Sequence, residues 1–167
     1  TGEATNMARK AVRSTTFMAP FISEDDGAIG EDANYDKYIE TLDERHLSLV
    51  PGQKPDRFYV QRLNAANFVQ LQEFMALIAE GGVKGMDAYQ QFSTGLLGHC
   101  LRGFDRFEYQ VSSNEYGEIV TEVASVAKGQ EASEEHIALI SSDPTLVYNI
   151  FKFALSLSSM SEQEKKD

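Results

Sequence analysis

Apolar residues recur at helical spacing in the last quarter of the chain. Asp143 and Pro144 begin this segment with a residue that caps backbone N–H groups and one that suits the first helical turn. Leu146, Ile150, Phe153 and Leu157 then follow at intervals of four, three and four residues. This spacing puts them on one side of a helix, so the pattern predicts a helix with one buried face.

Four earlier segments show the same periodicity. The predicted helices are Tyr35 to Leu42, a helix that Asn64 caps and Gly81-Gly82 ends, a helix from about Asp87 to Arg102, and a short helix after Ser133. Phe68, Leu71, Phe74 or Met75, and Ile78 line the buried side of the second. Gly95 and Gly98 lie inside the third, where each costs about 1 kcal/mol relative to Ala. We expect them to allow close helix–helix approach, with a hinge as the alternative.

Strand-like patterns are fewer and shorter. Arg57 to Leu63 is rich in aromatic and branched residues, and Phe107 to Val111 alternates between apolar and polar positions. Glu118 to Val123 could return as a partner strand, although Ile119, Val123 and Val126 also fit a helix. We therefore predict a mainly α fold, a single compact helical domain with a small β-strand element.

The first 32 residues are expected to form an extended acidic N-terminal arm, followed by a mainly helical protein-binding domain over residues 33–167. The arm carries one apolar patch, Phe17 to Ile22, which would anchor it either to its own core or to a partner. Because few of its residues fit the core pattern, we predict that the arm is dispensable for folding.

The charge balance narrows the classes of partner. The net charge is −11, and the stretch from Glu24 to Glu44 holds nine carboxylates against the single cation Lys37. Nucleic acid and anionic membranes repel such a surface, whereas a basic or apolar protein would not. The stretch is either a solvated acidic segment or an electrostatic docking arm.

The chain shows no pattern that points to catalysis. Cys100 is the single cysteine, His46, His99 and His136 are scattered, and Gly81 to Gly85 lacks the spacing of a phosphate-binding loop. We therefore predict no catalytic residue, no metal and no cofactor, and a protein that is not an enzyme. A single cysteine fits a reducing cytoplasm, no signal peptide is visible, and no apolar stretch is long enough to span a bilayer.

Three stretches carry a resemblance to a known family. They are Tyr38 to Glu44 followed by Gly52 to Leu63 (GQKPDRFYVQRL), Leu96 to Phe104 (LLGHCLRGF), and Ala154 to Asp167 (ALSLSSMSEQEKKD). Their order and spacing resemble the tail assembly chaperones of long-tailed bacteriophages and related small tail proteins. Asp56 and Phe104 stand where the family usually has Thr and Trp, and residues 1–34 have no counterpart.

The resemblance implies a function in the host cytoplasm. Such chaperones bind the tape measure protein, keep it soluble, recruit tail tube subunits and leave before the virion is complete. An apolar helical groove would then receive an amphipathic client helix. The candidate contacts are Phe68, Leu71, Phe74, Ile150, Phe153 and Leu157, with the alternative that all six are core residues.

Other functions stay open at this point. A structural tail or head–tail connector protein would be retained in the virion, and a phage-coded inhibitor of a host protein would use its acidic face. Whether the chain forms a homo-oligomer is also left open.

Overall fold

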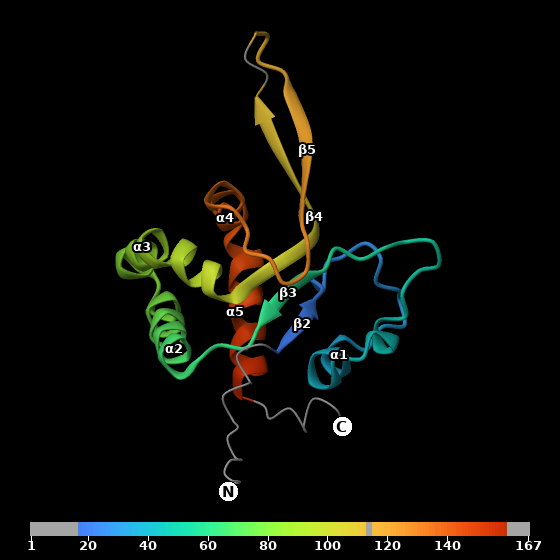
Figure 1. The fold of residues 1–167 in the computed structure, drawn as a ribbon, viewed down its shortest axis with the longest axis horizontal. Coiled ribbons are helices and arrows are strands. Elements are labelled where there is room, and N and C mark those ends of the chain that lie inside the picture. The colour runs from blue at the N-terminus through green and yellow to red at the C-terminus, as the bar shows by residue number, and fades with distance from the viewer. Residues whose placement is uncertain (1–16, 113–114, 160–167) are drawn as a thin grey trace, which may run out of the picture.

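The computed structural model of the chain describes residues 17–112 and 115–159 (Figure 1). Within these residues, four strands form one antiparallel sheet in the order β2-β3-β4-β5. The strands are β2 (Met18–Phe21), β3 (Phe58–Gln61), β4 (Leu101–Ser112) and β5 (Ile119–Val126). The α-helices are α1 (Tyr35–Thr41), α2 (Ala65–Glu80), α3 (Gly82–Cys100), α4 (Glu134–Ser141) and α5 (Pro144–Ser159), and η2 (Glu44–Leu47) is a 3-10 helix.

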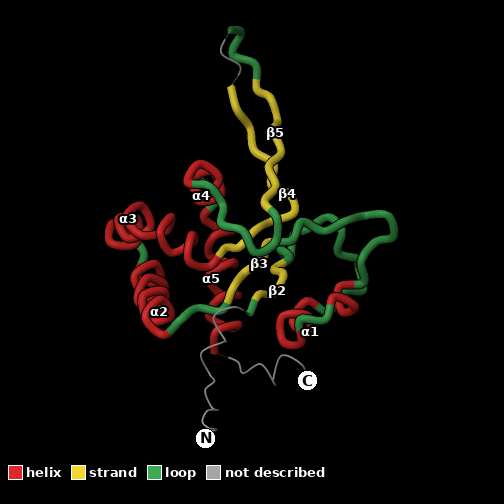
Figure 2. Tube along the Cα trace, in the orientation of Figure 1, coloured by secondary structure: helices red, strands yellow, loops and turns green. Residues whose placement is uncertain are grey.

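The fold is mixed α/β, so the prediction of a mainly α domain is wrong. The predicted strands are present, but they do not form a minor element. Together with β2 they form a four-stranded sheet, and the helices lie around this sheet (Figure 2). The error arises because strand pairing is long-range. β2 and β3 are separated by more than thirty residues of chain, and no local pattern reveals that they pair.

The region predicted as an arm belongs to the folded body from Phe17 onward. Met18 to Phe21 forms β2, which pairs with β3, and Ala19, Phe21 and Ile22 are buried. The apolar patch is therefore anchored to the protein's own core. Pro20 lacks a backbone N–H group, and it is tolerated here because β2 is an edge strand. The predicted boundary at residue 33 thus divides the folded body, and we no longer expect residues 17–32 to be dispensable.

Local capping signals explain most helix starts. The side chains of Asn64, Ser133 and Asp143 each accept a hydrogen bond from the backbone N–H three residues later, at 2.8, 3.2 and 3.2 Å respectively. α3 differs from its prediction, because it begins at Gly82 rather than near Asp87. Gly81 has a φ of +70°, a conformation that glycine adopts at low cost, and this single residue separates α3 from α2. The sequence also predicts a helix start at Ser161 and Glu164, which have the spacing of a capping box, but both lie outside the described residues.

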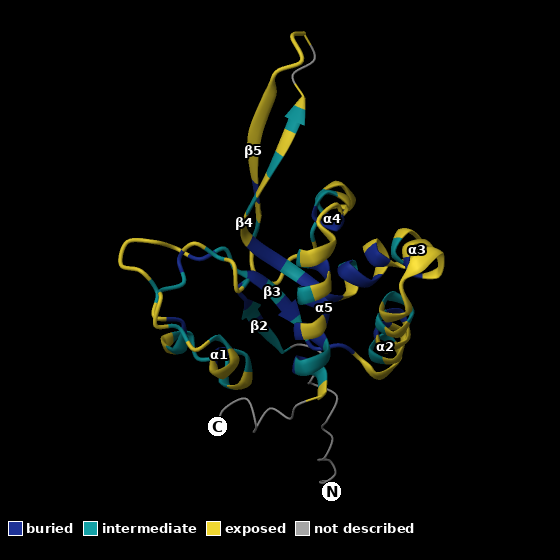
Figure 3. Cartoon of the chain, turned by 180° about the vertical axis from the view of Figure 1, so that it is seen from behind, coloured by how far each residue is buried: buried dark blue, intermediate teal, exposed yellow. Residues whose placement is uncertain are grey.

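The core lies where α5 crosses the sheet. α5 contacts β2 and β3 as well as α2, α3 and α4. Its buried residues are Val147, Ile150, Phe151, Phe153, Ala154 and Leu157, a wider set than the single predicted stripe. Figure 3 shows the buried residues concentrated at this crossing, with exposed residues on the outer sides of the flanking helices.

A β-hairpin projects from this body. β4 and β5 pair from Phe104 opposite Val126 to Ser112 opposite Ile119, with a register shift between Phe104 and Phe107, and the pair extends well beyond the other elements (Figure 1). The strand prediction for Glu118 to Val123 is confirmed, and the helical alternative is wrong. β4 is longer than predicted because it follows α3 directly at Leu101, without an intervening loop.

Candidate functional site

The six candidate contact residues belong to one hydrophobic core. Leu71, Phe74, Ile150, Phe153 and Leu157 are buried, and Phe68 is half-buried and packs against them. Phe74 meets Phe151 of α5 edge-to-face at 5.4 Å between ring centroids. Their burial therefore agrees with the alternative interpretation, in which all six are core residues. Two of them also line surface cavities, Phe74 between α2 and α3 and Phe153 between α5 and α1.

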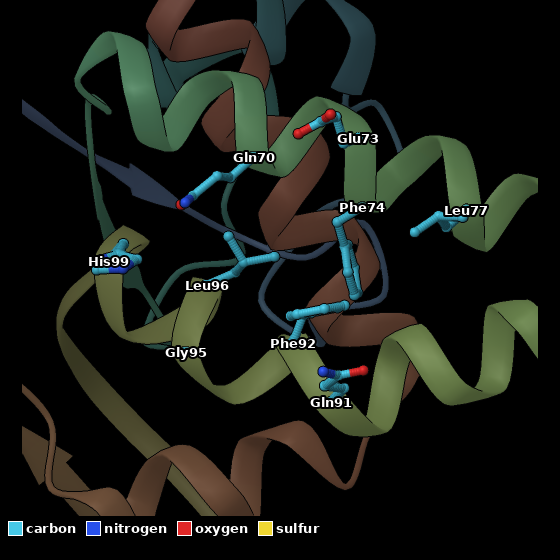
Figure 4. A pocket seen from close by; sticks show the side chains of 9 residues that line it. All are labelled: Gln70, Glu73, Phe74, Leu77, Gln91, Phe92, Gly95, Leu96 and His99. Atoms are coloured by element: carbon cyan, nitrogen blue, oxygen red, sulfur yellow. The ribbon is translucent and has the colours of Figure 1, made fainter.

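The cavity that Phe74 lines is a groove of about 450 Å³ between α2 and α3. Each helix supplies residues at positions i, i+3, i+4 and i+7, which lie on one helical face. They are Gln70, Glu73, Phe74 and Leu77 from α2, and Phe92, Gly95, Leu96 and His99 from α3, with Gln91 beside them. Figure 4 shows Phe74 and Phe92 approaching each other across the groove, with His99 and Leu77 toward its two ends.

Gly95 keeps the groove open. A Cβ atom added at Gly95 would meet nothing within 4 Å, and the same holds for Gly98. The expectation that these glycines allow close helix–helix approach is therefore wrong. Gly85 has that role, since its Cβ would lie 3.4 Å from the Leu77 carbonyl oxygen of α2. The missing side chain at Gly95 instead leaves space between the two helices.

The groove combines an apolar floor with a polar rim. Phe74 and Leu96 are buried beneath it, while the Phe92 side chain is 44% exposed on its wall. Gln70, Glu73 and Gln91 supply amide and carboxylate groups at its edges. Such a surface binds apolar side chains and hydrogen-bonds to the polar groups around them. We see no arrangement of these residues that would activate a nucleophile.

Cys100 is a buried residue of the core. Burial raises the pKa of its thiol to about 12, so almost no reactive thiolate forms at neutral pH. Among the described residues, no cluster of His, Cys, Asp and Glu has the geometry to hold a metal ion. That the chain is not an enzyme stays a prediction.

In the described part of the chain, none of the helices combines the length and the hydropathy needed to cross a bilayer. A comparison with protein-family models finds no match, and comparisons with curated proteins and with solved structures also find none.

The sequence did not predict the groove. The spacing of apolar residues along a helix does not show how much of that face a neighbouring helix covers. The spacing of Tyr89, Phe92, Leu96 and Cys100 puts them on one side of α3, yet the Phe92 side chain is 44% exposed while Leu96 and Cys100 are buried. Gly95 was the available signal. A glycine beside a large apolar residue, inside a helix whose stability it lowers, is consistent with space reserved for another side chain.

Proposed function

We propose that the protein is a phage tail assembly chaperone that binds the tape measure protein in the groove between α2 and α3. The observation that carries the proposal is this groove, with its buried Phe74 and Leu96 and its exposed Phe92. The resemblance of Gly52 to Leu63 and Leu96 to Phe104 to the family supplies the identity of the client. The second stretch includes Leu96 and His99, which line the groove.

The spacing of the residues that line the groove suits one face of a client helix. Both walls are helices, and their lining residues repeat at helical spacing. An amphipathic client helix presents apolar side chains with the same repeat, so two or three of them can enter the groove together. Gln70, Glu73 and Gln91 then face the polar flanks of that helix. Apolar client residues would be covered until tail tube subunits replace the chaperone, which would take place in the host cytoplasm.

The test is coexpression with the tape measure protein encoded in the same phage genome. Gly95→Leu places a side chain in the open space and should block the groove, while it also raises helix propensity. We expect the tape measure protein to copurify with the wild-type chain and to become insoluble with the variant. Gly98→Leu is the matched control, because Gly98 also has free space around it but does not line the groove.

A second pair of variants removes apolar area instead of adding it. Phe92→Ser should reduce copurification, whereas Met86→Ser, on the same helix, should not. Met86 is more exposed than Phe92 and lies outside the groove. Equal effects of the two changes would contradict the proposed site.

Mass spectrometry of purified virions tests the functional class. A chaperone should be absent from mature particles. Stoichiometric presence would instead identify a connector or structural tail protein.

A further inference from the structure

The two faces of the projecting hairpin differ in composition. Residues directly opposite each other in an antiparallel pair have side chains on the same face. One face, here called the ladder face, is made by the pairs Phe107–Ala124, Tyr109–Glu122 and Val111–Val120. The opposite face is made by the pairs Glu108–Val123, Gln110–Thr121 and Ser112–Ile119. The ladder face therefore holds most of the apolar side chains.

The ladder face continues the hydrophobic core outward. Phe104 is fully buried and meets Phe107 edge-to-face, at 6.5 Å between ring centroids. Phe107 in turn stacks on Tyr109 at 6.2 Å. Beyond them, Val111 is half-buried and Val120 is 44% exposed. Six residues of each strand give this part of the hairpin a length of about 20 Å.

An apolar face on a two-stranded ribbon needs a further partner. Isolated two-stranded hairpins are marginally stable in water, and exposed apolar patches commonly mark interaction sites. Within the described residues, helices cover the base of the sheet but not the outer part of the hairpin (Figure 3). The structure thus leaves Val111 and Val120 available to another molecule.

The charge around the ladder face limits what that molecule can be. From Phe107 to Ala127, the sequence contains four glutamates and neither lysine nor arginine. A cavity of about 520 Å³ lies at the base of the hairpin and adjoins the ladder face at Phe107, while Glu108 of the opposite face also lines it. Five carboxylates line the cavity, those of Asp25, Asp26, Asp56, Glu108 and Asp143.

One cation lines this cavity, and it is already paired. The guanidinium of Arg106 lies 3.4 Å from the Asp56 carboxylate and also pairs with Glu108. Within the described residues, no lysine or arginine pairs with Asp25, Asp26 or Asp143. Burial raises the pKa of the Asp56 carboxyl, the positive charge of Arg106 lowers it, and the negative charges of Asp26, Glu108 and Asp105 raise it. An additional cation in the cavity would relieve this repulsion.

We propose that the ladder face and the cavity at its base bind a segment of a partner protein in which lysine or arginine flanks apolar side chains. The apolar side chains would cover Tyr109, Val111 and Val120, and a basic side chain would enter the cavity toward Asp56 and Asp143. Nucleic acid and anionic lipid would be repelled. A second copy of this chain would bring the same glutamates against each other. The inference is independent of the groove between α2 and α3.

The test uses a fluorescent peptide of alternating lysine and valine, long enough to span the ladder face. We expect it to bind the full chain in a fluorescence anisotropy titration, with affinity that falls as salt is raised toward about 0.15 M. Peptides that replace valine by serine, or lysine by glutamate, should bind about tenfold more weakly or worse. Equal binding of the lysine–serine peptide would overturn the proposal, because only non-specific attraction would then remain.

Two sets of variants locate the binding surface. Val111→Ser combined with Val120→Ser should weaken binding about tenfold, and Val123→Ser on the opposite face should change it less than about twofold. Asp56→Asn with Asp143→Asn should also weaken binding, while the charge-matched change of Glu40→Gln with Glu80→Gln should not. Because asparagine also caps helices, the Asp143 variant keeps the start of α5.

The remaining outcomes would contradict the proposal directly. If Val123→Ser weakens peptide binding as much as Val111→Ser with Val120→Ser does, the peptide does not bind the ladder face. If Glu40→Gln with Glu80→Gln weakens binding as much as Asp56→Asn with Asp143→Asn does, the cavity is not part of the site. Sedimentation that shows a dimer abolished by Val111→Ser with Val120→Ser would identify a second copy as the occupant. Circular dichroism of each variant checks that the fold is intact.

Discussion

The two halves of β4 belong to one strand but lie in opposite environments. Leu101 to Phe104 pairs with β3 and contributes to the core, whereas Phe107 to Ser112 pairs with β5 alone and stays partly exposed. The difference originates in β3, which ends its pairing with β4 at the Phe58–Phe104 position. Burial of a strand is thus set by how far its neighbours extend, as much as by its own residues.

Within β4, the largest expected difference in the free energy of unfolding is between alanine variants of two phenylalanines that lie three positions apart. Phe104→Ala should lower the free energy of unfolding by about 4 kcal/mol, because a fully buried ring is lost from the core. Phe107 is half-buried, so Phe107→Ala should cost about 1–2 kcal/mol. Urea denaturation measures both. Equal costs would mean that the base of the hairpin is as well packed as the body.

Substitution of a glycine at the base of the hairpin should have a smaller effect on stability. Gly103 has a φ of +109°, and a Cβ there would lie 2.5 Å from the Ala127 carbonyl oxygen. Gly103→Ala should therefore cost about 3 kcal/mol through backbone strain and steric overlap. The control is Gly98→Ala in α3, where nothing lies within 4 Å and the change should stabilise the helix by up to about 1 kcal/mol. Thermal unfolding in which Gly103→Ala is the more stable of the two variants would contradict the positive φ and the close contact at Gly103.

Removal of the outer hairpin should have the smallest effect on stability. Tyr109 and Glu122 are directly opposite, so an Asn-Gly turn can replace Gln110 to Thr121 and close the hairpin early. We expect the free energy of unfolding to change by less than about 1 kcal/mol, since the removed residues of β4 and β5 are half-buried or exposed. The shortened protein should nevertheless no longer bind the lysine–valine peptide. A large loss of stability would show that the outer hairpin supports the body.

Predictions from the sequence succeeded where the determining interactions are local. Asn64, Ser133 and Asp143 bond to backbone groups three residues away, so the residue itself specifies a helix start. β2 could not be recognised in the same way. It is four residues long and contains Pro20, and its pairing partner lies far along the chain.

The candidate site was harder to predict for a related reason. The spacing of Leu71, Phe74, Ile150 and Phe153 correctly indicates one face of each helix, but it does not say whether that face meets the core or a partner. Phe92 shows the opposite case, an apolar residue that shares a side of its helix with the buried Leu96 and Cys100 and stays exposed. Only the relative placement of α2 and α3 distinguishes the two situations.

The pairing of β4 with β5 also makes the reach of this protein adjustable. Side chains alternate between the two faces of a strand, so the addition of one residue to each strand would exchange the faces, whereas two would restore them. The hairpin can therefore lengthen or shorten in steps of about 7 Å without disturbing the body or the identity of its faces. Two residues inserted between Gln110 and Val111, with two more between Val120 and Thr121, would then move the Val111–Val120 pair away from the cavity at the base and keep it on the ladder face.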